Sequence, residues 1–339
     1  MAKVMLAMSG GVDSSVAVAV LQEAGHEVEG ITMCLGDETV AEKAQRCASF
    51  FGIRHHVVDL KQTFEKAVVA PFVSAYQSGK TPNPCVRCNE RVKFGVLFQY
   101  AEQFGFDYFA TGHYAKVVQV GTRYTIQRAD YLPKDQSYVL YPLPQTVLRR
   151  LLLPLGAYSK TEIRAKAEAL GLAAAKQKDS QDICFIPDGN YRGFLQNRGV
   201  QCPTGNFVDL QGNVLGQHQG ITNYTIGQRK GLGIALGHPV FVVGIVPERN
   251  EVVLGLEQDL LQRQMWTGEN HFCSIDRLTK AMAVAVKVRY KSPAVPAVIE
   301  PLGDDLVQVT FAAPEKAITP GQSAVFYQGD LVLGGGLIL

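Results

Sequence analysis

Short apolar runs alternate with amphipathic stretches over roughly the first 110 residues of the chain. The apolar runs predict strands, and the stretches between them, with apolar residues three or four positions apart, predict helices. The expected strands are Lys3–Met8, His26–Met33, Ile53–Leu60 and Phe106–Tyr114. The expected helices are Ser14–Glu23, Thr39–Phe51, Phe64–Gln77 and Val92–Phe104. This alternation indicates an α/β fold with a doubly wound parallel sheet.

The pattern changes near residue 198. From Gly199 onward the chain is rich in glycine and valine and contains short runs such as Phe241–Glu248 and Glu251–Leu256. Turn signals then recur about every 8–12 residues toward the C-terminus, which indicates a small antiparallel barrel or sandwich. We therefore expect three domains, over residues 1–198, 199–264 and 265–339.

Composition and charge narrow the class of protein. The 33 basic and 31 acidic residues give a net charge of +2, which argues against a chain that coats nucleic acid everywhere but allows a local basic groove. No apolar run approaches the roughly 18–20 residues that cross a bilayer, and no signal peptide is recognisable. Seven cysteines, an odd number, make a disulfide framework unlikely and leave metal or thiol chemistry open. We expect a cytoplasmic protein without a membrane partner.

The first strand runs into a glycine-rich heptad, Ser9-Gly10-Gly11-Val12-Asp13-Ser14-Ser15. Two glycines let backbone N–H groups approach phosphate oxygens, and the following helix N-terminus adds positive potential. The serines can donate further hydrogen bonds, while Asp13 could cap the helix or help to hold Mg²⁺. The Walker and GxGxxG patterns are both absent, and a capped glycine turn is the structural alternative. We predict a phosphate site.

The heptad resembles the pyrophosphate loop of N-type ATP pyrophosphatases. Those enzymes split ATP into AMP and pyrophosphate, and most of them activate a carbonyl oxygen as an adenylate. Adenylation supplies a good leaving group, so the resemblance implies a nucleophile later in the chain.

Cysteines are the second chemical signal. Cys85 and Cys88 form a CxxC in a proline-stiffened loop, and a helix expected to begin near Arg91 would depress a thiol pKa. CxxC alone allows half a zinc site, a redox pair, iron–sulfur ligands or coincidence, and no second CxxC or HxxxH completes a zinc site. Cys184 lies in the mixed charged and apolar segment Lys178–Ile186, which suits a pocket edge. Small, buried or half-buried side chains are expected for the remaining thiols, Cys34, Cys47, Cys202 and Cys273.

Sequence blocks spread from Ser9 to Tyr327 resemble the tRNA-specific 2-thiouridylase family. The blocks are SGGVDSS, TPNPCVRCN with RVKF, ATGHYAKV, LPKDQSYVLY, KDSQDICFIPDGNYRGFL, TNYTIGQRKGLGI, VRYKSP and TPGQSAVFY. The resemblance implies an ATP pyrophosphatase (catalytic) domain over 1–198, a small central tRNA-contacting domain over 199–264 and a C-terminal antiparallel β-barrel over 265–339.

The resemblance also implies a reaction. ATP would adenylate the C2 oxygen of the wobble uridine in tRNAs for Lys, Glu and Gln, and a persulfide on Cys184 would deliver sulfur to C2. Cys88 would be the partner that attacks the persulfide, leaving a Cys88–Cys184 disulfide to be reduced. Because a persulfide is more nucleophilic than a thiol at neutral pH, the assignment is chemically coherent. A cysteine desulfurase or a sulfur-relay protein would supply the sulfur.

An iron–sulfur mechanism stays open beside the persulfide route. Some family members have Asp where this chain has Cys85, so that Cys85, Cys88 and Cys184 could together hold a [4Fe–4S] cluster whose unique iron binds sulfide. Both chemistries use the same residues. We favour the persulfide route.

Further site residues follow from the resemblance alone. Met33 and Gly112 are implied to contact the adenosine, and Asn83, Pro84 and Cys85 to flank the flipped-out target base. The implied tRNA contacts are His113, Lys134, Asp135, Gln136, Arg289, Tyr290 and Gln322. Without the resemblance, we would interpret Met33 as a core residue at a strand end and Gly112 as part of a turn. His113 would be a loop histidine, residues 134–136 a charged surface turn, and residues 289–290 an exposed strand end.

Two rival functions remain. Another ATP pyrophosphatase, such as an amidotransferase-type synthetase, would keep its activity in Cys-to-Ser variants. A non-catalytic RNA-binding protein would bind tRNA without ATP, and the phosphate loop argues against it. We further expect a monomer, and a rearrangement of residues 178–190 when tRNA binds.

Overall fold

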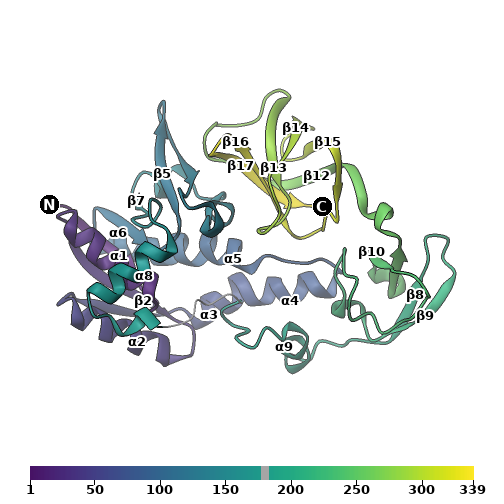
Figure 1. Cartoon of the computed structure of the whole chain (residues 1–339), viewed down its shortest axis with the longest axis horizontal. Coiled ribbons are helices and arrows are strands. Elements are labelled where there is room, and N and C mark those ends of the chain that lie inside the picture. Colours follow the sequence, from purple (N-terminus) through teal and green to yellow (C-terminus); the bar gives the residue numbers. More distant parts are fainter. Residues whose placement is uncertain (177–182) are drawn as a thin grey trace.

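The N-terminal domain is built on a five-stranded parallel sheet in the order β3-β2-β1-β4-β7 (Figure 1). The computed structural model describes residues 1–176 and 183–339. The strands are β1 (Lys3–Ala7), β2 (Glu27–Cys34), β3 (His55–Asp59), β4 (Tyr108–Thr111) and β7 (Leu151–Leu152). β1 pairs with β2 on one side and with β4 on the other, so the winding direction reverses there. In such sheets ligands bind at this reversal, beyond the carboxyl ends of the strands.

Helices cover both faces of this sheet, as the alternating pattern predicts. Val4 and Leu6 pack on one face against α1 (Val12–Glu23), α2 (Glu38–Phe50) and α8 (Lys160–Ala169), while Met5 points into the core on the other face. That second face is covered by two long helical rods. The first consists of α3 (Lys61–Phe64), η1 (Glu65–Val69) and α4 (Ala70–Gln77), and the second of α5 (Pro84–Arg87), η2 (Cys88–Leu97) and α6 (Phe98–Gln103). The predicted parallel α/β fold is confirmed.

One predicted helix boundary is wrong. The helix expected from Val92 begins at Pro84, so both thiols of the CxxC lie within helical turns rather than in a loop. Proline suits the first position of a helix because its missing N–H is not needed there. Asn83 is the N-cap, and its side chain accepts a 3.4 Å hydrogen bond from the N–H of Val86.

The C-terminal domain is a closed antiparallel barrel of six strands, which confirms the predicted barrel. Neighbours follow the order β12-β15-β14-β13-β16-β17, and a β12–β17 pairing closes the ring. The strands are β12 (Leu261–Phe272), β13 (Met282–Lys287), β14 (Val295–Pro301), β15 (Val307–Lys316), β16 (Ser323–Gln328) and β17 (Leu331–Ile338). A hairpin of the N-terminal domain, β5 (Ala115–Val120) and β6 (Arg123–Arg128), extends the sheet beyond β17. The barrel is therefore joined to the N-terminal domain by backbone pairing.

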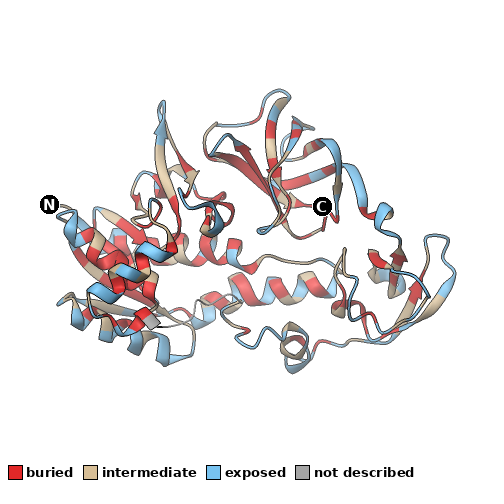
Figure 2. Cartoon of the chain, in the orientation of Figure 1, coloured by how far each residue is buried: buried red, intermediate tan, exposed pale blue. Residues whose placement is uncertain are grey.

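The central domain is a small four-stranded sheet in the order β10-β11-β8-β9, and α9 (Tyr191–Asn197) precedes it in the chain. Its strands are β8 (Gly205–Val208), β9 (Val214–His218), β10 (Phe241–Val246) and β11 (Glu251–Gly255). Short turns of helix complete the described chain: η3 (Leu132–Lys134), η4 (Ser137–Leu140), α7 (Gln145–Leu148), η5 (Ala173–Lys176), η6 (Ile221–Asn223), η7 (Pro247–Arg249) and η8 (Glu257–Leu260). Figure 2 shows buried residues gathered in the N-terminal sheet and the barrel, with exposed ones along the β8–β9 hairpin. The predicted domain boundaries stay predictions.

Among the described residues, no helix is both long enough and apolar enough to span a membrane.

Candidate active site

The heptad lies where β1 ends and α1 begins, at the reversal of the sheet. Gly10 has a φ of +69°, and a Cβ there would lie 2.5 Å from the Cβ of Lys43 and 2.7 Å from its carbonyl carbon. Both the backbone conformation and the contact with α2 therefore require glycine. The turn is fixed by sterics rather than by a ligand.

Serine hydroxyls hold the heptad in shape. The hydroxyls of Ser14 and Ser15 donate to the carbonyl of Gly11 at 3.1 and 2.9 Å, and the N–H of Ser9 donates to Ser14 Oγ at 3.3 Å. Gly11 is the N-cap of α1, and no side chain caps this helix. The first N–H groups of a helix have no partner within it, which suits an anion, and the phosphate site stays a prediction.

Asp13 is held by two side chains rather than serving as a cap. Lys160 Nζ donates to both carboxylate oxygens at 2.7 and 2.8 Å, and the hydroxyl of Tyr114 donates to Oδ1 at 2.6 Å. The suggestion that Asp13 caps α1 is therefore wrong, since the cap position belongs to Gly11. Lys160 was missed in the sequence because it lies 147 residues from its partner and in no recognised motif.

Gly112 packs directly on the first turn of α1. A Cβ at Gly112 would lie 3.2 Å from the nitrogen of Ser14 and 3.3 Å from the carbonyl carbon of Asp13. Met33 is half-buried near the end of β2, packed against the core on the α5–η2 side of the sheet. Both residues thus lie beside the carboxyl edge that carries the heptad, and their adenosine contacts stay predictions.

The three thiols singled out by the sequence lie in a shared electrostatic environment. Cys88 is buried, while Cys85 and Cys184 reach the surface. Removal of water by the surrounding protein raises the pKa of all three thiols, that of Cys88 to about 11, and the charge of Cys184 adds to the effect on Cys85 and Cys88. The depressed thiol pKa expected from a nearby helix start is therefore wrong, because the desolvation of a thiolate outweighs the local positive charge.

Lys93 is the cation that opposes this rise. Its ammonium lowers the pKa of Cys85, Cys88 and Cys184, although less than desolvation raises it. The η2 segment is a π-helix that begins at Cys88 and contains Lys93. In a π-helix, backbone hydrogen bonds join residues that are five positions apart. In an α-helix the two side chains would point in different directions. The RVKF block contains Lys93, but its closeness to the three thiols becomes visible only in the folded chain.

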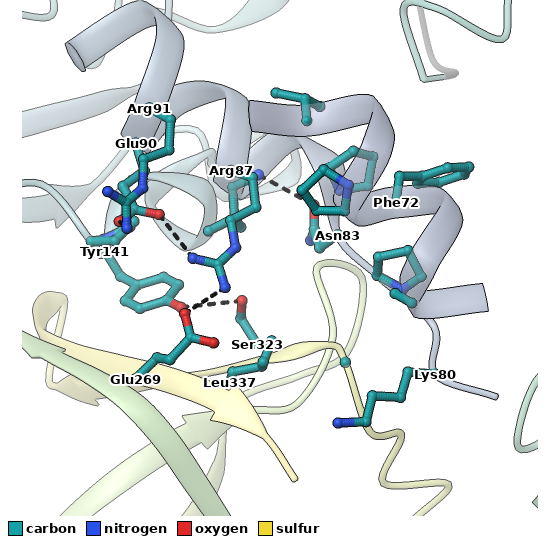
Figure 3. A pocket seen from close by; sticks show the side chains of 18 of the residues that line it. Phe72, Lys80, Asn83, Arg87, Glu90, Arg91, Tyr141, Glu269, Ser323 and Leu337 are labelled. Carbon is teal, nitrogen blue, oxygen red and sulfur yellow. Dashed lines mark hydrogen bonds and ion pairs between the residues drawn. The ribbon is translucent and has the colours of Figure 1, made fainter. Parts of the chain in front are cut away.

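A cavity of about 380 Å³ lies beside α5, between the N-terminal domain and the barrel (Figure 3). Asn83 and Pro84 line it, whereas Cys85 does not. Arg87 crosses the cavity, where its guanidinium donates to Glu90 at 3.3 Å and to Glu269 of β12 at 2.5 Å. The cavity also carries aromatic and basic side chains, namely Phe72, Tyr141, Lys80 and Arg91.

Several predicted tRNA contacts take part in protein contacts. His113 is only 9% exposed, and its Nδ1 lies 2.7 Å from the hydroxyl of Thr111. Burial holds the pKa of His113 well below its usual value, so the ring is neutral. The side-chain amide of Gln322 donates to the carbonyls of Thr81 and Pro82, which ties the barrel to the segment before α5.

The remaining predicted tRNA contacts lie near the junction of β6 and the barrel. Asp135 is buried and accepts hydrogen bonds from Ser137 and Ala129, and Gln136 accepts one from the N–H of Tyr114. Arg289 donates to the carbonyls of Ile226 and Ala317. Lys134 is half-buried and Tyr290 is 37% exposed. The roles of these residues in tRNA binding stay predictions.

The segment Lys178–Asp182 of the Cys184 block lies outside the described residues, as does part of the expected 178–190 rearrangement. All seven cysteines are free. Within residues 1–176 and 183–339, no group of three or more His, Cys, Asp or Glu side chains is arranged to hold a metal ion.

Comparisons with known proteins cover nearly the whole chain. Residues 2–188 match a model described as a tRNA methyl transferase HUP domain, residues 192–256 the corresponding PRC-barrel domain, and residues 262–338 an aminomethyltransferase beta-barrel domain. The tRNA-specific 2-thiouridylase MnmA of Carboxydothermus hydrogenoformans is 46% identical over 355 residues, covering 99% of this chain and 97% of that one. The chain belongs to the tRNA-specific 2-thiouridylase family.

Other members of the family are equally similar. The tRNA-specific 2-thiouridylase MnmA of Desulforudis audaxviator is 48% identical over 342 residues, covering 100% of this chain and 98% of that one. Among solved structures, a 4-thiouridine synthetase–RNA complex with bound ATP is 22% identical, with a TM-score of 0.37, and the alignment covers 58% of this chain and 50% of that one.

Proposed function

We propose that this protein converts the wobble uridine of tRNAs for Lys, Glu and Gln into 2-thiouridine, at the expense of ATP. Membership of the family carries the coarser part of this statement: the chain is a tRNA-modifying sulfurtransferase with an ATP-binding α/β domain. The wobble position, the tRNA set and the sulfur chemistry belong to the proposal. The single observation that supports it best is that the domain whose α1 has an N-terminus without a side-chain cap also carries three thiols, Cys85, Cys88 and Cys184, that lie close enough to affect one another.

The first half of the proposed reaction is adenylation. The C2 oxygen of uridine attacks the α-phosphorus of ATP, a P–O bond to pyrophosphate breaks, and the uridine becomes an O-adenylate. The uncapped N-terminus of α1 and the glycine turn would bind the departing phosphates. Mg²⁺ would come bound to the phosphates, because it keeps many phosphate and water ligands and takes only one or two carboxylates from a protein.

The second half transfers sulfur. The terminal sulfur of a Cys184 persulfide attacks C2, the C2–O bond breaks and AMP leaves. Cys88 then attacks the Cys184 sulfur, the S–S bond breaks, thiouridine is released and a Cys88–Cys184 disulfide forms. A thiol reductant must supply two electrons to restore the enzyme, and a cysteine desulfurase or relay protein must reload Cys184.

Substrate RNA would approach from the side of the barrel. The target base would enter beside Asn83, Pro84 and Cys85, which requires it to leave the base stack. The cavity beside Asn83 and Pro84 is also lined by Lys80 and Arg91, whose positive charges suit contacts with RNA phosphates. These basic groups support an RNA substrate.

The experiment is anaerobic purification followed by iron and sulfide assays and by thiolation of unmodified tRNA with ATP and a cysteine desulfurase. We expect substoichiometric iron and activity that Cys184→Ser abolishes. About four irons per chain, lost together with activity in Cys85→Ser, would move the mechanism to a [4Fe–4S] cluster. Activity toward another acceptor in Cys-to-Ser variants would favour a synthetase, and tRNA binding without any ATP turnover would favour an RNA-binding protein.

A further inference from the structure

Two helix N-termini meet beside the phosphate loop. Asp13 lies in the first turn of α1, and Lys160 is the first residue of α8 after its N-cap, Ser159. The two helices pack against each other, and Lys160 reaches both carboxylate oxygens of Asp13. This part of the sheet edge therefore combines two positive helix ends with an ammonium group.

Lys160 occupies a position that is unfavourable for a lysine on general grounds. A cation at a helix N-terminus faces the positive end of the helix dipole. Its side chain is also only 11% exposed, so the ammonium has lost most of its water. The contact that offsets both costs is the ion pair with Asp13, in the first turn of α1.

A nearby ion pair on the same two helices shows the contrast. Lys166, also on α8, donates to both oxygens of Glu23 on α1 at 2.9 and 2.8 Å. The side chains of Lys166 and Glu23 are 31% and 57% exposed, and they lie at the far end of α1 from the loop. The two pairs join the same helices with similar geometry, but only the Asp13–Lys160 pair lies at the phosphate loop.

We propose that Lys160 is a positioning residue for ATP: it fixes Asp13 so that the N–H groups of α1 face the phosphates, and it offsets the carboxylate charge that would otherwise repel them. The hydroxyl of Tyr114 completes the hold on Asp13. This inference rests on the proposed function, since it assigns a residue to the ATP-binding step of that reaction.

The test measures direct binding of radiolabelled ATP to the full chain by equilibrium dialysis, and tRNA binding by filter retention. Lys160→Met should weaken ATP binding at least about tenfold, because the negative charge of Asp13 then has no cation beside it and keeps only the hydroxyl of Tyr114 as a partner. Lys160→Arg should recover part of that loss. The matched control, Lys166→Met, should bind ATP like the wild type, and all three variants should bind tRNA normally. Wild-type ATP affinity in Lys160→Met, or no recovery in Lys160→Arg, would overturn the proposal.

A double variant keeps the test decisive if Lys160→Met does not fold. Asp13→Asn/Lys160→Met removes the unpaired charge, and we expect it to fold and to bind ATP more weakly than the wild type. Wild-type ATP binding by this variant would overturn the positioning role. Steady-state pyrophosphate release should show a raised KM for ATP with kcat changed less than about threefold. If the wild type binds ATP but thiolates no tRNA, the proposed function fails while the role of Lys160 is still tested by dialysis.

Discussion

The phosphate loop is already held in one shape in the free protein, whereas the thiols of the cysteine segment are not yet in a reactive form. At the loop, Gly10, Gly11 and the serines are locked by sterics and hydrogen bonds, Asp13 is paired, and the N-terminus of α1 is left uncapped. At the cysteine segment, desolvation raises the pKa of Cys85, Cys88 and Cys184, so that these three thiols are protonated at neutral pH. ATP can thus be bound by fixed dipoles, whereas sulfur transfer needs a further event. Loading of a persulfide, which is nucleophilic at neutral pH, is that event in our account.

The largest expected effect separates the essential thiols from the rest. Cys88→Ser and Cys184→Ser should each lower tRNA thiolation by at least about 10³-fold, because neither serine can carry or attack a persulfide. Nucleoside mass spectrometry of the product tRNA measures the effect. Cys202→Ser is the matched control, since Cys202 Sγ lies 2.9 Å from the hydroxyl of Thr222 and a serine can keep that contact. Normal thiolation by the Cys88→Ser variant would show that Cys88 is not the partner that attacks Cys184.

The next prediction concerns thiol reactivity. With a pKa of about 11 against 9.0 for an ordinary thiol, Cys88 in the free enzyme should react with iodoacetamide at pH 7 about 100-fold more slowly than in the urea-unfolded chain. The rate should rise with pH up to about 11. Because the folded pKa is raised, the stability from neutral Cys88 is present below pH 9 and is lost as the pH rises through 11. Equal rates in the folded and unfolded chain at pH 7 would contradict the contrast between the two regions.

A substitution at the phosphate side should cost stability as well as binding. Gly10→Ala places a methyl group 2.5 Å from Lys43 Cβ at a φ of +69°, so we expect a loss of at least about 2 kcal/mol in the free energy of unfolding and weaker ATP binding. Urea unfolding and dialysis measure the two. Gly121→Ala is the control: its φ is +59°, but nothing lies within 4 Å of the new Cβ. Equal losses in both variants would mean that backbone strain alone, and not the contact with α2, fixes the loop.

The smallest effect is expected where the barrel meets α5. Glu269→Gln breaks the Arg87–Glu269 ion pair, whose side chains are 31% and 57% exposed, so the loss of stability should stay below about 1 kcal/mol. Thermal unfolding at low and high salt measures it, and the difference from wild type should shrink at high salt. The Lys316→Met variant, which breaks the exposed Lys316–Glu257 pair, is a suitable control. A loss of several kcal/mol would mean that this pair, rather than the β6–β17 pairing, joins the domains.

Local patterns predicted most of the fold. The strand before the heptad and the helix after it follow from apolar periodicity, and the barrel follows from short alternating runs. The start of α5 at Pro84 was missed because two prolines resemble a loop, although one of them suits the first position of a helix. Periodicity describes a segment, and it does not reveal which of two permitted roles a proline takes.

The sequence predicted which motifs carry the chemistry of the site, but it did not predict which charges lie beside them or how burial shifts their pKa values. The heptad and the cysteines were found from motifs, while Lys160 was not, since only folding brings it to Asp13. The influence of Lys93 on the thiols was not predicted either, because Lys93 lies in the π-helix η2, which has no sequence signature here. The predicted direction of the Cys88 pKa shift was wrong because the shift depends on burial by distant segments. A motif shows only the residues that lie next to Cys88 in the sequence.

The most direct test asks whether the enzyme still adenylates tRNA when it can no longer transfer sulfur. Single-turnover pyrophosphate release would be measured for the Cys88→Ser/Cys184→Ser variant with ATP and unmodified tRNA. Our account predicts a burst of pyrophosphate, stoichiometric with the enzyme, and no thiouridine. No burst from a folded variant that still binds ATP and tRNA would contradict it, because adenylation would then depend on the thiols.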